Sequence, residues 1–196
     1  MTQPRPLVFA VTGASGAPYA VRVLDVLARH QVPVWLIVSS HGWRLLKVES
    51  GIVNLAGLKK ATGGKWPAIT VFDDGDRGAK PASGSQKTRG MLICPCSMGT
   101  VAAIAHGTSR SLVERAADVT LKEGRKLVVV PRETPLSLVH LRNLTAAAEA
   151  GVTVLPGSPG FYHRPKQVSD LVDFIAQRIL DQFDLELDIA PRWGDD

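Results

Sequence analysis

The sequence predicts a three-layer α/β fold, in which a doubly wound parallel β-sheet forms a single domain over residues 1–196. Its apolar segments are short continuous runs rather than alternating patterns, which is typical of strands that are covered on both faces. These runs alternate with amphipathic helical stretches along the chain, and such alternation builds a parallel sheet with helices on both sides. A chain of 196 residues is long enough for one domain with a substantial core.

The first half of the chain carries three expected strands and two helices. Leu7–Val11 is predicted to be a buried strand, and Gly16–Arg29 is the helix that follows it. Val34–Val38 is the second strand. Trp43–Glu49 begins another helical stretch with less regular apolar spacing, and Ile69–Phe72 is a weak strand.

The second half continues the alternation after a long loop. A loop over residues 73–87, rich in Gly, Asp, Pro and Ser, is long enough to indicate a functional loop rather than a domain linker. Beyond it we expect strands at Met91–Cys94, Leu127–Val130 and Val152–Leu155, and helices at Met98–Ala105, Leu112–Lys122, Leu138–Ala150 and Lys166–Phe183. The tail, about 184–196, is expected to be irregular.

Composition and charge exclude several classes of protein. The hydrophobic fraction of 45% and the charged fraction of 21% are those of an ordinary soluble protein. The net charge of +5 favours an anionic ligand, but Lys and Arg are scattered, so we expect no nucleic-acid binding. Cys94 and Cys96 lie too close together to clip distant segments. No membrane span or signal peptide is apparent, and we expect a cytoplasmic protein.

The turn after the first strand is the first candidate binding site, because ligands of such sheets bind at the carboxyl ends of the strands. It reads Thr12–Gly16. Its glycines allow a close approach of the backbone, the helix that follows offers N–H groups to an anion, and its hydroxyls can donate to a phosphate. The dinucleotide-binding pattern of three glycines is absent, and a plain strand-to-helix turn remains the alternative.

Two further turns carry hydroxyl groups. Ser39, Ser40 and His41 follow the second strand, where a helix N-cap is the alternative interpretation. Pro95–Thr100 follows the fourth strand, and together with Thr12–Gly16 it would form a cradle for one phosphorylated ligand. The two cysteines have no His partners nearby for a zinc site, and Cys96 has no evident activating base.

Charged and aromatic residues follow the last two strands. Arg132 and Glu133 come directly after Leu127–Val130, between two prolines. Arg132 can grip a phosphate with its planar guanidinium group, and Glu133 in a partly dry pocket would have a raised pKa and could exchange protons. A surface ion pair is the alternative. The loop 156–165 carries an aromatic cluster, for which packing onto the core is the alternative.

Several motifs in this order resemble the UbiX-type flavin prenyltransferases. The motifs are Thr12–Gly16, Cys94–Ser97, Glu114–Asp118 with Lys122 and Glu123, Val130–Pro135, Pro159–His163 and Pro191–Trp193. The resemblance covers nearly the whole chain, from Leu7 to Trp193. Several motifs in the right order are far more specific than any one of them.

The resemblance implies a flavodoxin-like, Rossmann-like fold and a transferase that needs no metal. Members of this family form trimers that stack into dodecamers and bind reduced FMN near subunit boundaries. The donor is usually dimethylallyl monophosphate, whose prenyl group joins flavin N5 and then C6 while phosphate leaves. The prenylated FMN then serves a partner UbiD-type decarboxylase, often in ubiquinone biosynthesis.

The resemblance also assigns roles to residues of this sequence. FMN would contact Gly13, Ala14, Ser15, Ser39, Ser97, Met98, Gly99, Thr100 and Arg132. The donor phosphate would be held by Ser83, Gly84, Lys122, Tyr162 and Arg178, with Arg115 from a neighbouring subunit. Ser15, Glu49 and Glu133 would move protons, and Trp193 would place its ring near the developing allylic cation. Met98 stands where the family often has a small or polar residue.

The sequence also allows other interpretations of these residues and of the function. Read alone, Glu49, Lys122 and Arg178 look like exposed helix charges, and Trp193 looks like an anchor of the tail. The acidic stretch Asp73–Asp76 is the nearest approach to a magnesium motif, but a solvated turn explains it better. An FMN-dependent cysteine decarboxylase of the same fold, or a non-catalytic flavin carrier, would share the fold and the flavin.

Overall fold

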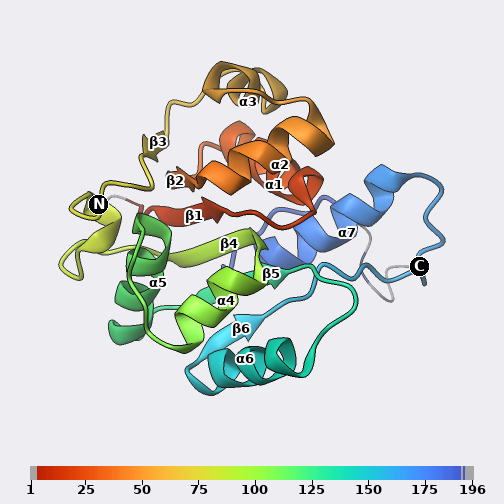
Figure 1. Ribbon diagram of the computed structural model, residues 1–196. Coiled ribbons are helices and arrows are strands. Elements are labelled where there is room, and N and C mark those ends of the chain that lie inside the picture. The colour runs from red at the N-terminus through yellow and green to blue at the C-terminus, as the bar shows by residue number, and fades with distance from the viewer. Residues whose placement is uncertain (1–3, 191, 193–196) are drawn as a thin grey trace.

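A six-stranded, all-parallel sheet in the order β3-β2-β1-β4-β5-β6 forms the centre of the computed structural model (Figure 1), which describes residues 4–190 and 192. The strands are β1 (Leu7–Val11), β2 (Val34–Val38), β3 (Ile69–Phe72), β4 (Gly90–Cys96), β5 (Leu127–Pro131) and β6 (Val152–Val154). The helices are α1 (Ala17–Arg29), α2 (Ser40–Ser50), α3 (Leu55–Ala61), α4 (Met98–Ala105), α5 (Leu112–Lys122), α6 (Leu138–Glu149), α7 (Val168–Asp181) and a short 3₁₀ helix, Lys80–Ala82. The predicted doubly wound α/β fold is confirmed.

The helices cover the two faces of the sheet in separate layers. One core cluster joins the sheet to α1, α2, α3 and α7, through residues such as Leu24, Leu46 and Ile179. The other joins the opposite face to α4, α5 and α6, through residues such as Val101 and Ala116. Helices α5 and α7 therefore lie on opposite faces of the sheet. Within the described residues, no helix is both long and apolar enough to cross a membrane.

The direction of winding reverses between β1 and β4, which pair directly at the centre of the sheet. Pro95 and Cys96, expected in the turn after the fourth strand, belong to β4 itself. Thr12 ties the turn after β1 to the end of β4 and to the turn that follows it, because its hydroxyl donates to the Pro95 carbonyl (3.0 Å) and accepts from the Ser97 N–H (2.9 Å). Parallel sheets of this topology bind ligands at such a switch point. Thr12 thus holds the two turns of the expected cradle side by side.

The structure differs from the sequence prediction mainly between β2 and β4, at helices α2 and α3 and at strand β3. Helix α2 begins three residues earlier than Trp43, because Ser39 caps it by accepting the Gly42 N–H at 3.0 Å. The short helix α3 was not predicted. Strand β3 is an edge strand with Thr70 and Val71 exposed, so the expectation that the strands are covered on both faces fails there.

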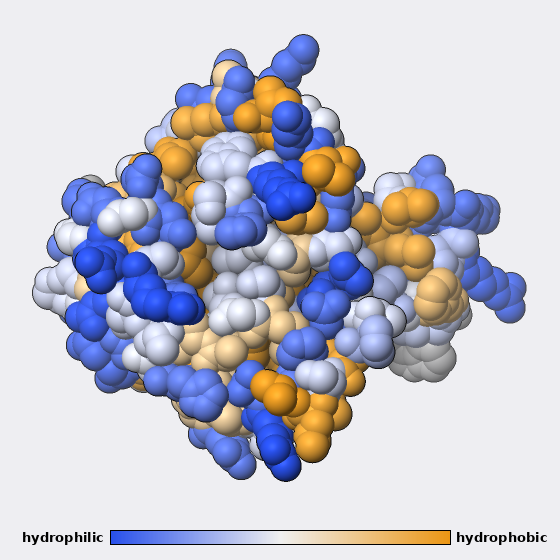
Figure 2. Space-filling model, viewed as in Figure 1, coloured by the Kyte–Doolittle hydropathy of each residue, from blue (hydrophilic) through white to orange (hydrophobic). Residues whose placement is uncertain are grey.

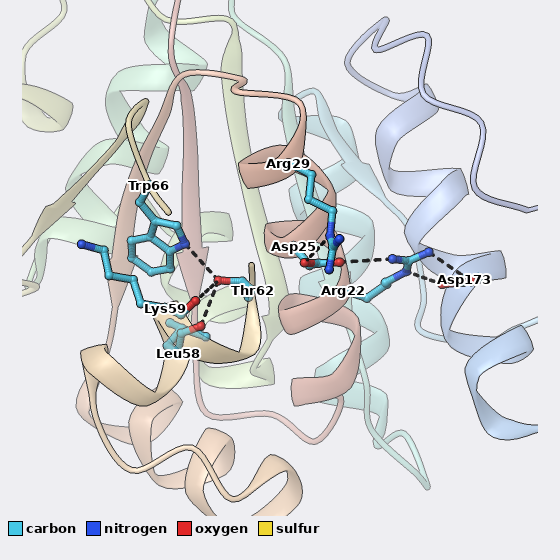
Figure 3. Close-up of polar contacts among 8 residues, drawn as sticks. All are labelled: Arg22, Asp25, Arg29, Leu58, Lys59, Thr62, Trp66 and Asp173. Carbon is cyan, nitrogen blue, oxygen red and sulfur yellow. Dashed lines mark hydrogen bonds and ion pairs between the residues drawn. The ribbon is translucent and has the colours of Figure 1, made fainter. Parts of the chain in front are cut away.

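Helix α7 is fastened to α1 by a chain of charged side chains (Figure 3). Arg22 binds Asp173 on α7 at 2.6 Å, and Asp25 lies between Arg22 (3.3 Å) and Arg29 (2.8 Å). Asp25 is nearly buried, so its charge requires these two partners. The same figure shows the Trp66 indole N–H donating to the Thr62 hydroxyl at 2.9 Å, which closes the region after α3. The Arg22–Asp173 ion pair fixes α7, and the residues that it carries, relative to α1 and so to the sheet on which α1 packs.

Gly42 provides a test of the packing beneath the site. A Cβ at this position would collide with the carbonyl oxygen of Val11 at the end of β1 and approach Val38 at 3.2 Å. We expect Gly42→Ala to lower the free energy of unfolding by about 1–3 kcal/mol, measured by urea denaturation.

Gly57→Ala is the matched control, because its Cβ would meet its nearest neighbour, Asn54, at 3.5 Å. In α3 it should be neutral or stabilising by up to about 1 kcal/mol, since alanine is the better helix former. If both variants lowered the free energy of unfolding equally, the close packing of Gly42 against Val11 would not be the cause.

Candidate active site

A cleft of about 370 Å³ lies at the switch point and is lined largely by hydroxyl groups. Its lining residues are Thr12, Gly13, Ser39, Ser40, His41, Asp74, Ser97, Thr100, Ser111, Val113 and Glu114. Figure 2 shows residues of intermediate hydropathy gathered in the centre of this face of the molecule, with hydrophilic residues around them. The predicted turns after β1, β2 and β4 therefore meet in one cleft, whose donors suit the ribityl and phosphate groups of a flavin nucleotide.

Three serines of this cleft also cap helices. Ser39 caps α2, Ser97 caps α4 by accepting the Thr100 N–H at 3.2 Å, and Ser111 caps α5 by accepting the Glu114 N–H at 3.4 Å. The N-cap interpretation of Ser39 is thus confirmed. A capping hydroxyl uses its oxygen as an acceptor and keeps its proton for another partner. The caps fix these hydroxyl groups in place. Ser39 keeps its proton for a ligand, whereas the Ser97 and Thr100 hydroxyls lie 2.9 Å apart, so one of them donates to the other.

The N-terminus of α1 does not present unoccupied N–H groups to an anion, contrary to the sequence prediction. The Glu49 carboxylate accepts from the N–H of Gly16 (2.9 Å) and of Ala17 (2.8 Å). Burial works to raise the pKa of Glu49, but these bonds, a hydrogen bond from Ser15 and the charge of Arg132 together hold that pKa below its ordinary value. Glu49 is therefore an ionised group in direct contact with Ser15, not an isolated helix charge.

The Glu49 contacts predict a pH-dependent stability. Because the pKa of Glu49 is lower in the folded protein than its ordinary value of 4.5, its stabilising effect is present above about pH 4.5 and is lost as the pH falls through the folded pKa. We expect Glu49→Gln to lower the free energy of unfolding by about 1–2 kcal/mol at pH 7. Urea denaturation at descending pH should show the difference from the wild type shrinking. A difference that stays constant down to the acid limit would rule out a charged contact.

Arg132 lies beside Ser15 and Glu49 in the structure. It lines a cavity of about 460 Å³ together with Ser15, Glu49 and the first residues of α7, Val168 and Val172. Within the described part of the chain, its buried Nε has no hydrogen-bond partner. An unsatisfied buried donor costs about 1–3 kcal/mol, so the arrangement fits a bound ligand that supplies an acceptor. The residues at this site thus fit a flavin nucleotide.

Glu133 departs from its expected surroundings. Its side chain is exposed in the single chain, and among residues 4–190 and 192 its carboxylate accepts only the neighbouring Thr134 N–H, at 3.1 Å. It lines a small cavity of about 140 Å³ with Arg132 and residues 156–158. The expected dry pocket is absent from the described chain, because Glu133 begins an open loop rather than lying beneath a helix.

The expected donor-phosphate residues of the long loop gather at the end of α5. Ser83 and Gly84 lie there, and Lys122 pairs with Glu123 at 2.6 Å. A Cβ on Gly84 would come within 2.9 Å of the Lys122 ammonium, so the loop and the lysine are in close contact. We name Ser83, Gly84, Arg115 and Lys122 the α5 group. Arg115 forms an ion pair with Asp118 at 2.6 Å on the same helix.

Arg125 was missed by the sequence reasoning. Its guanidinium donates to the carbonyl oxygens of Gly84 (2.6 Å) and Gln86 (2.7 Å), and so holds the loop in the shape that brings Gly84 to Lys122. Contacts with backbone carbonyls leave no trace in residue type or spacing. Only its place soon after Lys122 could have drawn attention to it.

Tyr162 and Arg178, which we name the α7 group, lie elsewhere. They line a cavity of about 240 Å³ beside the C-terminal segment. Arg178 is on α7 and Lys122 is on α5, so the sheet separates them and one chain does not bring the two groups together. Trp193, the remaining expected residue, lies outside the described residues.

Two other sequence features have structural explanations. Cys94 and Cys96 are buried, and burial raises the pKa of both thiols, so neither is an activated nucleophile. In the acidic loop, Asp73 and Asp76 accept backbone N–H groups two residues ahead, and Asp74 accepts the Val113 N–H at 3.0 Å. These carboxylates shape turns and cap α5. Among the described residues, no group of three or more His, Cys, Asp or Glu is placed to hold a metal ion.

Comparisons with known proteins identify the class to which this fold and site belong. The family model described as Flavoprotein matches residues 1–180. A flavin prenyltransferase UbiX from Pseudomonas aeruginosa is 43% identical, covering 100% of this chain and 97% of the relative. A dodecameric FMN-dependent UbiX-like decarboxylase from Escherichia coli O157:H7 superposes with a TM-score of 0.88 at 40% identity, covering 96% of this chain and 98% of that one.

A further solved structure holds two ligands. AnUbiX (PadA1), in complex with FMN and dimethylallyl pyrophosphate, has a TM-score of 0.89 and 38% identity, and the match covers 98% of each chain. The chain therefore belongs to the flavoprotein family and, within it, to the UbiX-type flavin prenyltransferases.

Proposed function

We propose that this chain is a flavin prenyltransferase that moves a dimethylallyl group from dimethylallyl phosphate to N5 and C6 of reduced FMN. The observation that carries the proposal is the full-length likeness to relatives of that name, one of them solved with FMN and a dimethylallyl donor. The geometry supports it, because the hydroxyl-lined cleft and the cavity beside Arg132 both lie at the carboxyl edge of the sheet and are lined by successive residues of the turn after β1, Thr12 and Gly13 in the cleft and Ser15 and Gly16 in the cavity.

FMN would occupy the switch-point cleft and reach toward Arg132. The ribityl and phosphate groups would accept from the Ser39 hydroxyl, from whichever of the Ser97 and Thr100 hydroxyls does not donate to the other, and from the backbone N–H groups of Gly13, Met98 and Gly99. Gly13 leaves room for this approach, since a Cβ there would lie 2.5 Å from the Cβ of His41. Arg132 would give its unpartnered Nε–H to the flavin nucleotide.

The chemical step would depend on cationic side chains. As the bond between the prenyl carbon and the phosphate oxygen breaks, its electron pair leaves with the phosphate, and the carbon joins N5. Fixed positive charges stabilise the leaving phosphate. Lys122, Arg115 and Arg178 would supply them together with the Tyr162 hydroxyl, in the place of a divalent ion. Val168 and Val172 offer an apolar wall for the prenyl group, and Trp193 would face the allylic cation.

Proton transfer would involve three residues. The N5 and C6 positions each lose a proton when they form bonds to carbon, and the prenyl double bond takes up one proton so that its tertiary carbon can join C6. Ser15 lies next to the flavin site and is hydrogen-bonded to ionised Glu49, which would receive the N5 proton through the hydroxyl. Glu133, exposed in one chain, would come to lie near the departing phosphate only when a second chain covers it.

The separation of the α5 and α7 groups indicates that each donor site is shared between chains. Since these groups lie on opposite faces of the sheet, a phosphate could touch both only where two copies meet. The α6 region exposes Leu136, Leu138, Val139 and Leu141, seen as an orange patch at the bottom of Figure 2. Exposed apolar patches are typical of interfaces. We infer a homo-oligomer, a dodecamer like the relative from Escherichia coli, working in the cytoplasm and passing its product to a UbiD-type decarboxylase.

The direct test is an anaerobic incubation of the protein with excess reduced FMN, dimethylallyl phosphate and EDTA, followed by mass spectrometry of the released flavin. We expect more than one equivalent of a flavin heavier by one five-carbon unit. The diphosphate serves as a parallel donor. Unmodified FMN only, from protein that binds FMN, would favour a flavin carrier. Decarboxylation of a cysteine-ending peptide instead would favour a cysteine decarboxylase.

A further inference from the structure

The cavity that holds the α7 group is closed on one side by the C-terminal segment. It is lined by Tyr162, Phe174, Gln177, Arg178, Asp181, Ala190 and Arg192. Ala190 and Arg192 follow α7 in the sequence and fold back over it. A single carboxylate, Asp181, therefore lies among two arginines in a cavity that is expected to receive an anion. Neither the family resemblance nor the proposed function gives Asp181 or Arg192 a task.

The segment after α7 is attached to that helix through Gln177 and Asp181. The Ile189 N–H donates to the Gln177 side-chain oxygen at 2.7 Å, and the Gln177 amide donates to Asp181 at 2.9 Å. Gln177 is 3% exposed, so these hydrogen bonds are shielded from water. Leu185, Leu187 and Ile189 also pack against the core. The segment up to Ile189 is thus held by both apolar and polar contacts.

Beyond Ile189, Asp181 binds the segment directly. Arg192 places two nitrogens on the two carboxylate oxygens of Asp181, at 2.9 and 3.2 Å, and also contacts Asp188 at 2.8 Å. A guanidinium that meets a carboxylate in this two-pronged way is held in orientation as well as attracted. Trp193 follows Arg192 in the sequence.

Arg178 shares the same carboxylate less closely. Its nearest nitrogen lies 3.4 Å from Asp181, at the weak end of hydrogen-bond geometry, and its side chain is 56% exposed. Burial works to raise the pKa of Asp181, but Arg192, Gln177 and Arg178 together hold it below its ordinary value, so the carboxylate is charged at neutral pH. Asp181 thus holds Arg192 firmly and leaves Arg178 able to turn to another anion.

We propose that Asp181 and Arg192 are positioning residues, whose ion pair fixes the C-terminal segment over the cavity where the prenyl donor's phosphate meets Tyr162 and Arg178. The inference rests on the proposed function for the identity of the anion. Loss of the pair would leave the flavin site intact, but would release the segment that closes the donor cavity. Binding of the donor would suffer more than binding of FMN.

The test compares Asp181→Asn with Glu186→Gln, which makes the same charge change at an exposed residue of the same segment. Asp181→Asn should raise KM for dimethylallyl phosphate about tenfold and leave KM for reduced FMN unchanged. Arg192→Ala, at the surface, should reproduce the effect, and the double variant should be no worse than either single one. The control should behave as wild type. Equal increases in both KM values, or additive effects, would overturn the proposal.

A second readout does not depend on turnover. Thermolysin cuts before aliphatic residues such as Leu187 and Ile189, and mass spectrometry of the chain reports the cleavage. We expect faster cleavage there in Asp181→Asn and Arg192→Ala than in the wild type, and protection of the wild type by dimethylallyl phosphate. Unchanged cleavage in both variants would overturn the proposal that the Asp181–Arg192 ion pair fixes the C-terminal segment. Failure of the wild type to prenylate FMN would overturn the proposed function, and with it the role of the Asp181–Arg192 pair in binding the prenyl donor. The cleavage rates would still show whether the pair fixes the C-terminal segment.

Discussion

Replacing Lys122 by alanine is expected to lower kcat/KM for dimethylallyl phosphate about a hundredfold to a thousandfold, while FMN binds as before. The ammonium group lies against Gly84 and Glu123 at the end of α5, and it is remote from the switch-point cleft. It would act only on the leaving phosphate. Steady-state rates under anaerobic conditions, with FMN affinity measured separately by fluorescence quenching, give both quantities.

Lys126→Ala is the matched control for Lys122→Ala. Lys126 is an exposed lysine four residues further along the chain, so its loss changes the net charge equally. We expect its kcat/KM to stay within about twofold of the wild type, because surface charges act weakly through solvent. If both variants lost activity to the same degree, the general positive field rather than a placed ammonium group would be responsible.

Replacing Arg132 by alanine is expected to weaken FMN binding about tenfold to a hundredfold. The reason is the buried Nε, which has no partner in the described chain and which we assign to the flavin nucleotide. Arg132 also adds to the positive charge that keeps Glu49 ionised, so the rate of prenyl transfer should fall as well. Isothermal titration calorimetry with FMN measures the first effect.

Two companion variants sharpen the Arg132 test. Arg132→Lys keeps the charge but loses the planar guanidinium group, and it should recover only part of the affinity. Arg5→Ala removes an equal charge from an exposed position before β1, at the opposite edge of the sheet from the cleft, and should bind FMN as the wild type does. Wild-type affinity in Arg132→Ala would show that the cleft holds FMN without this residue.

Much of the fold was predictable because local signals and tertiary packing agree. Leu7–Val11 and Val34–Val38 are continuous apolar runs, and the structure gives the same bounds. Leu112–Lys122 was predicted with both its ends from a regular apolar face, and the structure adds the Ser111 cap at its start. Helix α3 was missed because seven residues that include Gly57 give too short a pattern.

The site was predicted in part, because its turns follow directly from the strands. The serines of those turns come together as expected, since parallel strands end at one edge of the sheet. What could not be foreseen depends on contacts across long sequence separations. Glu49 reaches the N-terminus of α1 from 33 residues away, and Arg125 reaches Gly84 from 41. The exposure of Glu133 likewise reflects an open loop that residue types do not reveal.

The central claim is that cationic side chains from two chains together draw the phosphate away from the prenyl group, and mixed oligomers test it most directly. Lys122→Ala and Arg178→Ala chains, each nearly inactive alone, would be co-expressed with different tags and purified for assemblies that contain both. Each shared site needs one lysine and one arginine from different chains, so random assembly should restore about a quarter of the wild-type rate of prenylated FMN formation. A mixture as inactive as its parents would contradict the claim.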